Sequence, residues 1–349
     1  MATMVEVAKR ANVALSTVSY ALNGTRPISE KTRQRIFDAM EELGYTPHAL
    51  ARALASKHSR IIALLLSTPE RGLGITELEF VVSATEAAKA NGYHLVLWLA
   101  DVHGRTELQD LINQGLVDGV IVMEVHLHDE HIKMLRRLNF PFSAIGRCEN
   151  NAGIYYADID FEQTIRDAIT YLSGLGHTHI AFLNHSQDEF DAGYGPAVRA
   201  QAGFEETMRA AGLERVTRLC HATPRAGYEA FTQLVTEHPE LTALIAMNDR
   251  ALPGVMHAIA DRGWRIPDDF SIISAVTSAR DSEMMVPPLT TMDSPGRELG
   301  RLGVELLVRQ LETKPPDVAQ MLLPCPLVVR SSSGPCRPKA RRPVKRPAK

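Results

Sequence analysis

The sequence predicts a small all-α head, built as a helix-turn-helix unit, followed by a larger α/β body with parallel sheets. Three observations support this fold class. Apolar residues recur at helical spacing in residues 1–44, short apolar strands alternate with helices from residue 61 onward, and the two regions differ in the sign of their charge. The body, residues 61–333, is too large for one such sheet, so two lobes are expected.

Charge is unevenly distributed along the chain. Residues 1–60 hold nine Lys/Arg and five Asp/Glu, and residues 330–349 hold eight Lys/Arg and no acid. The remaining residues hold 21 bases and 36 acids, so the net charge of −3 combines a basic head, a basic tail and an acidic body. This segregation predicts a polyanionic partner for the head only.

Composition excludes several other classes of protein. A hydrophobic content of 45% and a charged content of 23% are typical of globular chains, and no apolar run is as long as a membrane span. The N-terminal MATMVEVAKR lacks the apolar core of a signal peptide, so a cytoplasmic location is expected. The four cysteines are widely spaced, without a C-x-x-C pair, which predicts reduced thiols.

Three short helices are predicted in the head, which spans residues 1–46. The first two, 4–11 and 15–23, are joined by a turn at Asn12, a residue type that tolerates positive φ. Ser29 can cap the third helix and Gly44 can end it. Two short helices joined by a tight turn, with a third beside them, define a helix-turn-helix unit.

The second of these helices, LSTVSYALN, has an unusual polar side. Val18, Ala21 and Leu22 share its apolar side, and the rest carries hydroxyl groups without any charged residue. An ordinary surface helix carries Glu and Lys there. Small hydroxyl groups without negative charge suit a helix that enters the major groove of DNA, so this helix is the predicted recognition helix.

These residues carry a resemblance to a known family. VEVAKRANV…STVSYALNGTRPISEKTRQRIFDAMEELGYTPHALARAL resembles the DNA-binding head of the lactose/galactose repressor (LacI/GalR) family of bacterial transcription regulators, over nearly all of residues 4–54. The resemblance implies operator DNA as partner and a homodimer. It also implies base contacts by Leu15, Ser16 and Tyr20 and phosphate contacts by Thr17, Ser19 and Asn23.

Four positions of the head depart from the family pattern. Asn12 replaces Gly, Ala14 replaces the Ser that caps the recognition helix, Tyr20 replaces Arg, and His48 replaces Asn. Loss of the cap is expected to cost the helix about 1 kcal/mol. Tyr20 changes the base preference that the resemblance would otherwise imply.

Residues 47–60 are the predicted hinge helix and linker. Leu50 and Leu54 lie one turn apart in PHALARALAS, which is too short and too rich in alanine to be a stable helix alone. One interpretation is a frayed linker. The resemblance implies a helix that folds on DNA, pairs with its dimer mate and wedges Leu54 into the minor groove, and we favour this interpretation.

The body alternates buried strands with helices, which predicts parallel sheets covered on both faces. The predicted strands are 61–66, 93–99, 118–123, 142–146, 179–183, 243–247 and 270–276. LGHTHIAFL, AMND, RGWRIPDDFSII and PPLTT extend the resemblance, which implies a two-lobed periplasmic-binding-protein-like fold with three crossovers. Lobe one would hold residues 61–160 and 292–322, and lobe two residues 161–291 and 323–333.

Ligands of open parallel sheets bind beyond the carboxyl ends of the strands. This rule predicts a small-molecule effector between the lobes, carbohydrate-like or another metabolite. The candidate effector-binding residues are Ser67, Trp98, Asp101, Glu124, Asp160, Arg199, Asn248, Asp249 and Val276. Trp98 has two interpretations, a surface that stacks on the ligand and a core residue.

Two positions in the predicted cleft depart from sugar-binding members of the family. Val276 stands where these carry the Asp of a G-x-D phrase, and Ala200 stands where they carry Arg, with Arg199 one residue away. A carboxylate and a guanidinium together bind vicinal hydroxyl groups through charge-assisted hydrogen bonds. Without this pair a small free sugar is expected to bind poorly, which predicts a less hydroxylated or larger effector.

The body carries no recognisable signature of catalysis or of cofactor binding. G-x-S-x-G, G-x-x-x-x-G-K-[ST] and a G-x-G-x-x-G after a strand are absent, so we expect neither an enzyme nor a cofactor. His126, His128 and His131 in EVHLHDEH could bind a metal, but nothing supplies a fourth ligand, and we expect a polar loop that opens a helix. His177 is expected to support its turn.

The basic segment 334–349 is predicted to be disordered, with a modest contribution to nonspecific DNA affinity. Together these features predict a ligand-responsive, sequence-specific transcriptional regulator, a repressor that acts as a homodimer on a pseudo-palindromic operator. The alternative is a cytoplasmic sugar-binding or sugar-processing α/β protein whose head only tethers it to DNA. Turnover of a bound ligand would favour the alternative.

Overall fold

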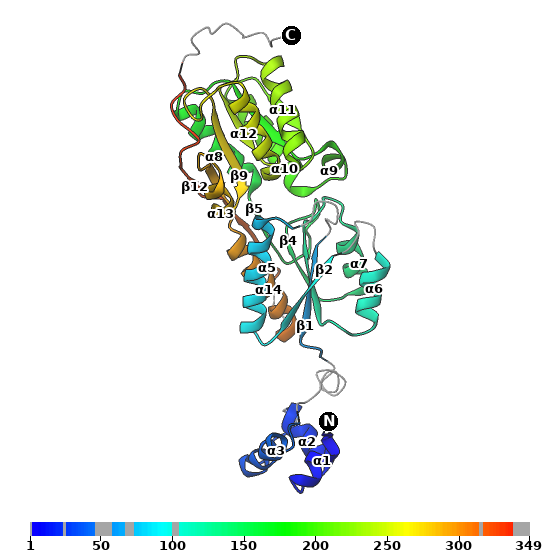
Figure 1. Ribbon diagram of the computed structural model, residues 1–349. Coiled ribbons are helices and arrows are strands. Elements are labelled where there is room, and N and C mark those ends of the chain that lie inside the picture. The colour runs from blue at the N-terminus through cyan, green and yellow to red at the C-terminus, as the bar shows by residue number, and fades with distance from the viewer. Residues whose placement is uncertain are drawn as a thin grey trace.

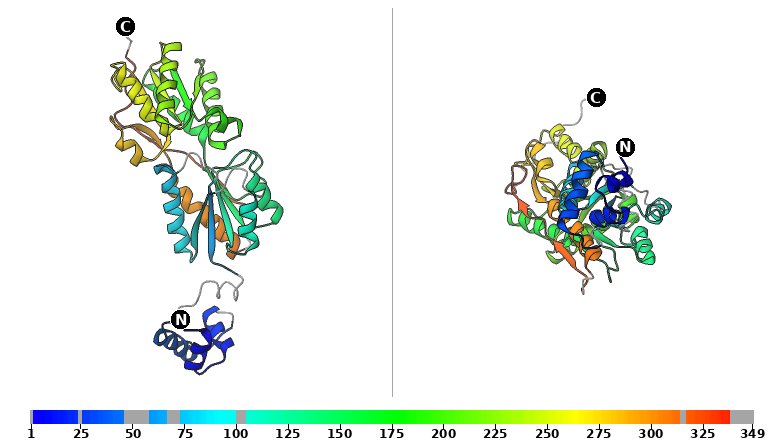
Figure 2. Two further views of the ribbon diagram at one scale, coloured as in Figure 1. Left: turned by 45° about the vertical axis from the view of Figure 1, so that its right-hand side comes forward. Right: turned by 90° about the horizontal axis from the view of Figure 1, so that it is seen from below.

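The computed structural model of the protein describes residues 2–23, 26–45, 58–66, 73–99, 105–313 and 317–337. Figure 1 shows a helical head at the N-terminal end followed by two α/β lobes. Figure 2 shows the same three units after a turn of the molecule about the vertical axis, and a second view from below. The predicted fold class, a helix-turn-helix head on an α/β body with parallel sheets, is confirmed.

The head consists of α1 (Met4–Arg10), α2 (Leu15–Asn23) and α3 (Glu30–Glu42). Thr3 and Glu6 form a capping box at the start of α1, and the hydroxyl of Ser29 caps α3. Asn12 has a φ of 50°, so the predicted sharp turn between α1 and α2 is confirmed. The helices enclose an apolar core of Val7, Ala8, Ala11, Val18, Ala21, Ile36, Ala39 and Met40.

Lobe one is built on a parallel sheet with the strand order β11-β5-β4-β3-β1-β2. Its strands are β1 (Ile61–Leu66), β2 (His94–Leu99), β3 (Gly119–Met123), β4 (Phe142–Ile145), β5 (Tyr156–Ile159) and β11 (Gln320–Leu323). Its helices are α5 (Ile75–Ala90), α6 (Arg105–Asn113), α7 (Glu130–Leu138) and α14 (Gly296–Glu312). Residues at alternate positions of β1 join two different apolar clusters, because both faces of the sheet are covered.

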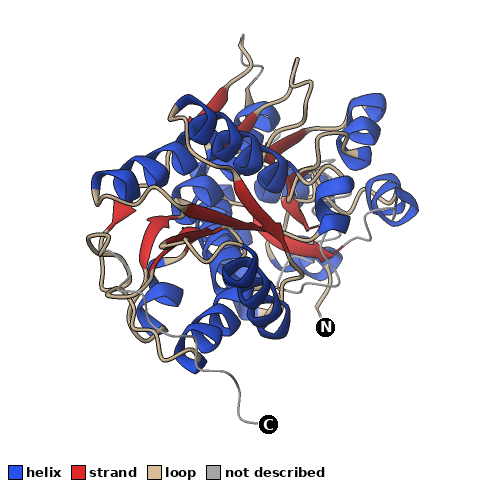
Figure 3. Ribbon diagram, turned by 90° about the horizontal axis from the view of Figure 1, so that it is seen from above, coloured by secondary structure: helices blue, strands red, loops and turns tan. Residues whose placement is uncertain are grey.

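Lobe two repeats the arrangement with the strand order β12-β10-β9-β8-β6-β7. Its strands are β6 (Ile180–Asn184), β7 (Val216–Leu219), β8 (Ala243–Ala246), β9 (Ser271–Thr277), β10 (Thr290–Asp293) and β12 (Leu327–Val328), and β12 runs antiparallel to β10. Its helices are α8 (Phe161–Gly174), α9 (Gln187–Asp191), α10 (Gly195–Ala210), α11 (Pro224–Glu237), α12 (Leu252–Asp261) and α13 (Ala279–Met284), with a 3-10 turn η1 (Asp249–Ala251) before α12. Seen from above, the strands lie between layers of helices (Figure 3).

The chain crosses between the lobes three times, after β5, after β10 and after β11. The first crossing follows Ile159, the last residue of β5. The other two lie one or two residues later than expected, because β10 and β11 complete their pairing first: Asp293 pairs with Thr277, and Leu323 pairs with Ile159. Five short strands, β5, β7, β10, β11 and β12, were absent from the predicted set.

The first residues of the basic tail are packed, so the prediction that disorder begins at residue 334 is wrong. The carbonyl of Gly334 lies 3.0 Å from Nε2 of His177, and Arg337 pairs with Asp268 at 2.9 Å. His177 is buried and its Nδ1 lies 2.9 Å from the hydroxyl of Thr242, so it supports this turn as predicted. Residues 338–349 lie outside the described part.

The four cysteines are free thiols, as the sequence predicts, and three of them are buried. Burial raises the pKa of Cys148 to about 11 and the pKa of Cys220 to about 12. These thiols therefore stay protonated near neutral pH and are poor nucleophiles. Within the described ranges, no helix is both long enough and apolar enough to span a membrane.

Candidate functional site

Helix α2 buries one side and leaves the predicted recognition side accessible. Val18 and Ala21 are 0% and 3% exposed in the core of the head. The predicted contact residues occupy the remaining positions: Leu15 and Ser16 are exposed, Thr17, Ser19 and Tyr20 are half-buried, and the side chain of Asn23 lies outside the described part. An uncharged face of this kind can approach base edges and phosphates without electrostatic repulsion.

Two local features of α2 concern positions at which the sequence departs from the family pattern, Ala14 and Tyr20. Ala14 offers only its carbonyl to the first turn, accepting from the backbone N–H of Thr17 at 2.9 Å, whereas α3 has the Ser29 hydroxyl as a cap. The guanidinium of Arg26 lies 5.2 Å from the centre of the Tyr20 ring, within cation–π distance. A guanidinium is therefore held next to the position where the family carries Arg.

The predicted hinge residue Leu54 lies outside the described residues. Where the description resumes, the chain is fixed to lobe one. The backbone N–H groups of Ser59 and Arg60 donate to the two carboxylate oxygens of Asp118, at 2.7 and 2.9 Å, and the Arg60 side chain pairs with Glu312 at 3.0 Å. The segment from the head therefore joins the body next to β3 and the C-terminal end of α14.

A cleft with a cavity volume of about 90 Å³, partly open to solvent, lies between the two lobes at the carboxyl ends of their strands. Its apolar lining consists of Phe80, Met123, Val125, Ile145, Ile159, Phe161, Pro196, Ala222, Met247, Val276 and Leu299, together with Gly146. Its polar lining consists of Thr76, Glu77, Glu124, Arg147, Asp158, His185, Tyr194, Arg199, Asn248, Asp249 and Arg250. A concave site between two lobes that combines apolar side chains with converging polar groups is typical of small-molecule sites.

The structure brings together five of the nine candidate effector-binding residues: Glu124, Arg199, Asn248, Asp249 and Val276 all line this cleft. Asp160 instead caps α8, accepting from the backbone N–H of Gln163 at 3.0 Å. Trp98 packs against the apolar cluster of lobe one and does not line the cleft, which corresponds to its interpretation as a core residue. Ser67 and Asp101 lie outside the described residues.

Arg199 lines the cleft, whereas Ala200, which stands at the position where the family carries Arg, does not. Ala200 is 0% exposed within the core, because α10 turns it toward α8 and the sheet. Arg199, one residue earlier, faces the cleft and donates to the carbonyl groups of Arg147 and Cys148, both at 2.9 Å. The cleft therefore has a guanidinium from α10, although the family position for it is occupied by Ala.

Val276 lines the cleft with a φ of 58°. A β-branched residue rarely adopts this left-handed conformation, so local strain of about 1–3 kcal/mol is expected. The side chain is half-buried and packs against the main apolar cluster. It gives the cleft an apolar spot where sugar-binding relatives are expected to have a carboxylate.

Asp158 and Arg147 belong to the cleft but were absent from the candidate set. Asp158 lies in β5, is 5% exposed, and its Oδ2 lies 3.8 Å from Nε of Arg147. Arg147 also holds Glu162 through Nη2, at 2.9 and 3.1 Å. Burial raises the pKa of Asp158 to about 7, against the opposing effect of Arg147 and Arg199. Strand β5 is too short to be found from periodicity, so no signal marked Asp158.

Contacts across the cleft hold the lobes together on two sides. On one side the Tyr194 hydroxyl donates to Glu124, and the Gly195 N–H donates to the carbonyl of Val125 at 3.1 Å. On the other side Arg250 pairs with Glu77 at 3.2 Å. The same side carries a bond of 3.1 Å from the backbone N–H of Ser278 to the hydroxyl of Thr76. The described conformation is therefore a closed one.

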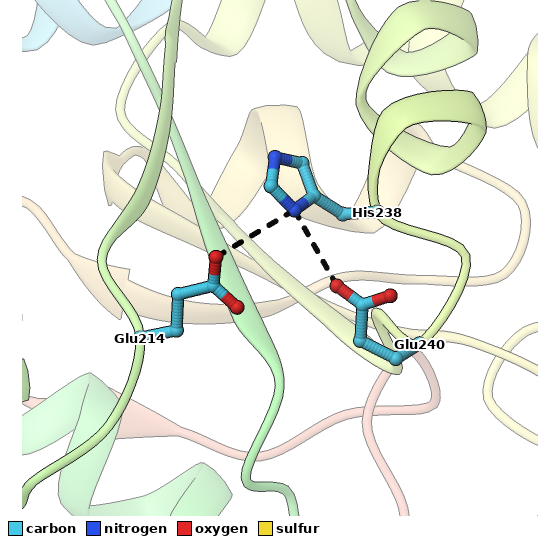
Figure 4. A group of neighbouring side chains, drawn as sticks. All are labelled: Glu214, His238 and Glu240. Carbon is cyan, nitrogen blue, oxygen red and sulfur yellow. Dashed lines mark ion pairs between the residues drawn. The ribbon is translucent and has the colours of Figure 1, made fainter.

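The histidines of EVHLHDEH do not form a metal site in this conformation. His128 points to Glu149 at the surface, whereas His131 is buried. Among the described residues, three possible metal ligands come together at a different place, where His238 lies 3.9 Å from Glu214 and 3.4 Å from Glu240 (Figure 4). Both contacts use Nδ1 of His238, and the carboxylates are 61% and 39% exposed, so the group is a surface ion-pair cluster.

Comparison with known proteins agrees with this architecture. Residues 3–48 match the family "Bacterial regulatory proteins, lacI family", and residues 169–333 match the "Periplasmic binding protein-like domain". Catabolite control protein A of Priestia megaterium is 29% identical, over 95% of this chain and 99% of its own length. The HTH-type transcriptional repressor PurR of Erwinia tasmaniensis is 30% identical, over 90% of this chain and 92% of its own.

Solved structures give the same result. The lac repressor dimer bound to operator and the anti-inducer ONPF is 26% identical, with a TM-score of 0.82 over 95% of this chain and 99% of its own. The transcriptional regulator CelR in complex with cellobiose is also 26% identical, with a TM-score of 0.71 over 95% of this chain and 100% of its own. The chain belongs to the LacI family of bacterial regulatory proteins. It is a ligand-responsive, DNA-binding transcriptional regulator, and the relatives named here are regulators rather than enzymes.

Proposed function

We propose that the protein is a cytoplasmic repressor that binds a pseudo-palindromic operator as a homodimer and changes its operator affinity when a small molecule fills the cleft. The observation that carries this proposal is the combination in one chain of an exposed, uncharged recognition helix and a cleft between two lobes that is lined by both apolar and polar side chains. Relatives support it, because PurR is named a repressor and the lac repressor structure is described as a dimer on its operator.

In this proposal α2 lies in the major groove. Leu15, Ser16 and Tyr20 read bases, and Thr17, Ser19 and Asn23 contact phosphates. Tyr20 occupies the position at which the family carries Arg. In this proposal the guanidinium comes instead from Arg26, which stacks beside Tyr20. A guanidinium donates to guanine O6 and N7 more strongly than a phenol does, so Arg26 is the better base-reading group of this pair. Leu54 would wedge into the minor groove between the half-sites.

Exposed apolar residues on lobe one support a dimer contact there. Leu78 and Val82 on α5 are 44% and 46% exposed, and β2 exposes Val96, Leu97 and Leu99. Strand β2 is the edge of its sheet, and an uncovered apolar edge strand is a site for association or aggregation. Pairing of α5 and β2 with the same elements of a second copy would place two heads side by side, as a pseudo-palindromic operator requires.

Switching would use the contacts across the cleft. An effector that favours one angle between the lobes also favours one spacing of the two heads, because Ser59 and Arg60 fix each head segment to lobe one. The effect is reciprocal: operator and effector each change the affinity of the other by the same factor. The cellobiose complex of CelR supports a carbohydrate or a related metabolite as effector.

Selection of binding sites from random DNA tests this proposal. The full-length protein should return a two-fold symmetric motif, and Arg26→Ala should relax the preference at one position of each half-site by about 1–3 kcal/mol. Arg33→Ala, which removes an exposed arginine from α3, is the matched control and should leave the motif unchanged.

A motif without symmetry, or the same motif for Arg26→Ala and the parent protein, would contradict these assignments. Turnover of a bound sugar would instead favour the alternative of a sugar-processing protein with a tethering head.

A further inference from the structure

Two residues that line the cleft each have a buried polar atom without a hydrogen-bond partner among the described residues: Oδ2 of Asp158 and Nη1 of Arg147. Asp158 is 5% exposed and the Arg147 side chain is 11% exposed. Buried polar atoms are nearly always hydrogen-bonded, to protein or to another molecule. The pair therefore has unused hydrogen-bonding capacity for one donor, at the carboxylate, and one acceptor, at the guanidinium.

The other atoms of both side chains are held in place. Oδ1 of Asp158 accepts from the backbone N–H of Ile159 at 2.8 Å, and β5 lies between β4 and β11 in the sheet. Nη2 of Arg147 is fixed by both carboxylate oxygens of Glu162. Because these bonds already orient both groups, a ligand would bind without ordering them first.

The charges around the pair are balanced. Arg147 and Arg199 carry two positive charges, and Asp158 and Glu162 carry two negative charges when ionised. Arg199 adds to the positive side with only backbone carbonyls as hydrogen-bond acceptors. A neutral ligand preserves this balance, whereas an anionic group at Asp158 would bring two negative charges together in a buried site.

We propose that Asp158 and Arg147 anchor an uncharged effector that carries a hydrogen-bond donor next to an acceptor, as on the vicinal hydroxyl groups of a sugar or one edge of a nucleobase. The inference rests on the proposed function, since it places the effector in the same cleft. The pair supplies the carboxylate and the guanidinium that Val276 and Ala200 do not provide. Both of its members come from lobe one.

If Asp158 anchors the effector, binding of the effector should release a proton. The pKa of Asp158 is raised to about 7 by burial and by Glu162 on α8, and is opposed by Arg147 after β4 and Arg199 on α10. The thiol of Cys325, beyond β11, also faces Asp158. A ligand that donates a hydrogen bond to the carboxylate favours its ionised form. Affinity should therefore rise as the pH rises from 6 to 8, with release of a proton on binding.

Calorimetry of the full-length protein tests the anchor. The neutral probes are D-ribose, D-glucose, cellobiose, adenine and uracil, and the anionic probes are ribose 5-phosphate and glucose 6-phosphate. At least one neutral probe should bind more tightly than the anionic probes. Asp158→Asn should weaken that binding by about 10- to 100-fold and abolish its pH dependence, because a hydrogen bond to a charged group is lost.

Asp167→Asn on α8 is the matched control, since it makes the same charge change at a carboxylate that does not line the cleft, and it should bind as the parent does. Tight binding of a sugar or of a base identifies which source supplies the donor and acceptor. Binding of phosphate esters alone, no binding of any neutral probe, or parental affinity of Asp158→Asn would overturn the anchor. Operator binding by the same preparations separates the two proposals, because a parent protein without operator affinity refutes the proposed function itself.

Discussion

The recognition face of the head and the cleft of the body assemble their residues in different ways. The recognition face comes from one nine-residue helix, Leu15–Asn23, whereas the cleft gathers side chains from Thr76 to Leu299 and from both lobes. A change in the first site acts on one helix. A change in the second acts through two sheets, three crossings and the contacts between lobes. The comparison teaches that DNA preference can vary in this chain without disturbing the effector site.

The two sites also differ in electrostatics. Helix α2 has no charged side chain, whereas the cleft contains carboxylates whose pKa values are raised by burial, among them Asp158 and Asp249. Salt should therefore act mainly on the head, through the phosphates of DNA, and pH should act mainly on the cleft.

The largest expected effect comes from adding a charge to the recognition face. Ser16→Glu places a carboxylate on an exposed position of α2 that is proposed to face DNA. Repulsion by the phosphates should lower operator affinity by at least about 100-fold, roughly 3 kcal/mol. Fluorescence anisotropy with operator DNA measures this loss, and effector affinity of the free protein should stay unchanged.

Gln34→Glu is the control for Ser16→Glu. It adds the same charge at an exposed position of α3, where it breaks only a surface hydrogen bond to Asp38. If both variants lost operator affinity equally, net charge of the head rather than the face of α2 would determine binding.

The next effect concerns Asp158 and pH. The pKa of this carboxyl is about 7 in the folded protein, against 3.8 for a solvent-exposed aspartate in the unfolded chain. The folded state therefore binds more protons between these values, and its stability falls as the pH rises through this range. Asp158→Asn should have nearly the parental Tm at pH 4 and be more stable than the parent at pH 8, by about 4 kcal/mol.

Thermal unfolding of both proteins across this pH range measures the difference. The ligand-free protein is required, because a bound effector would stabilise the ionised carboxylate. A Tm difference that is independent of pH would show that Asp158 keeps an ordinary pKa in the fold.

More of the head than of the cleft could be predicted from the sequence. The recognition face lies on one helix, whereas the cleft combines residues that are far apart in the chain. Helical periodicity, Ser29 and Asn12 are local signals, so the bounds of the helices and the turn could be read directly. The buried strands of the body were also found from their apolar runs. Short strands such as β5 carry too few residues for a pattern, and β5 holds Asp158.

Which residues face the cleft depends on tertiary structure that no local pattern encodes. Arg199 reaches the cleft only because α10 begins at Gly195, beside Val125 of the other lobe. Asp160 and Trp98 follow strands or lie in them, as candidate ligands should, yet Asp160 caps a helix and Trp98 packs, partly buried, against the apolar cluster of lobe one. The position of these residues in the sequence indicates that they lie near the cleft, but it does not determine where their side chains point.

The smallest expected effect is the stability difference between a glycine variant and an alanine variant, which should have opposite signs at Val276 and at Ser16. Val276 has a φ of 58°, so removing Cβ there relieves strain. Val276→Gly should be more stable than Val276→Ala by about 1 kcal/mol, because both variants lose the packing of the isopropyl group but only glycine adopts this conformation freely. At Ser16, the second residue of α2, glycine should instead be less stable than alanine by up to about 1 kcal/mol, because the helical conformation restricts the backbone freedom of glycine. Chemical denaturation of the four variants measures both differences. Because the packing loss is nearly the same within each pair, the sign of each difference reports the backbone alone, and a Val276→Ala protein as stable as Val276→Gly would show that the cleft is not strained at this residue.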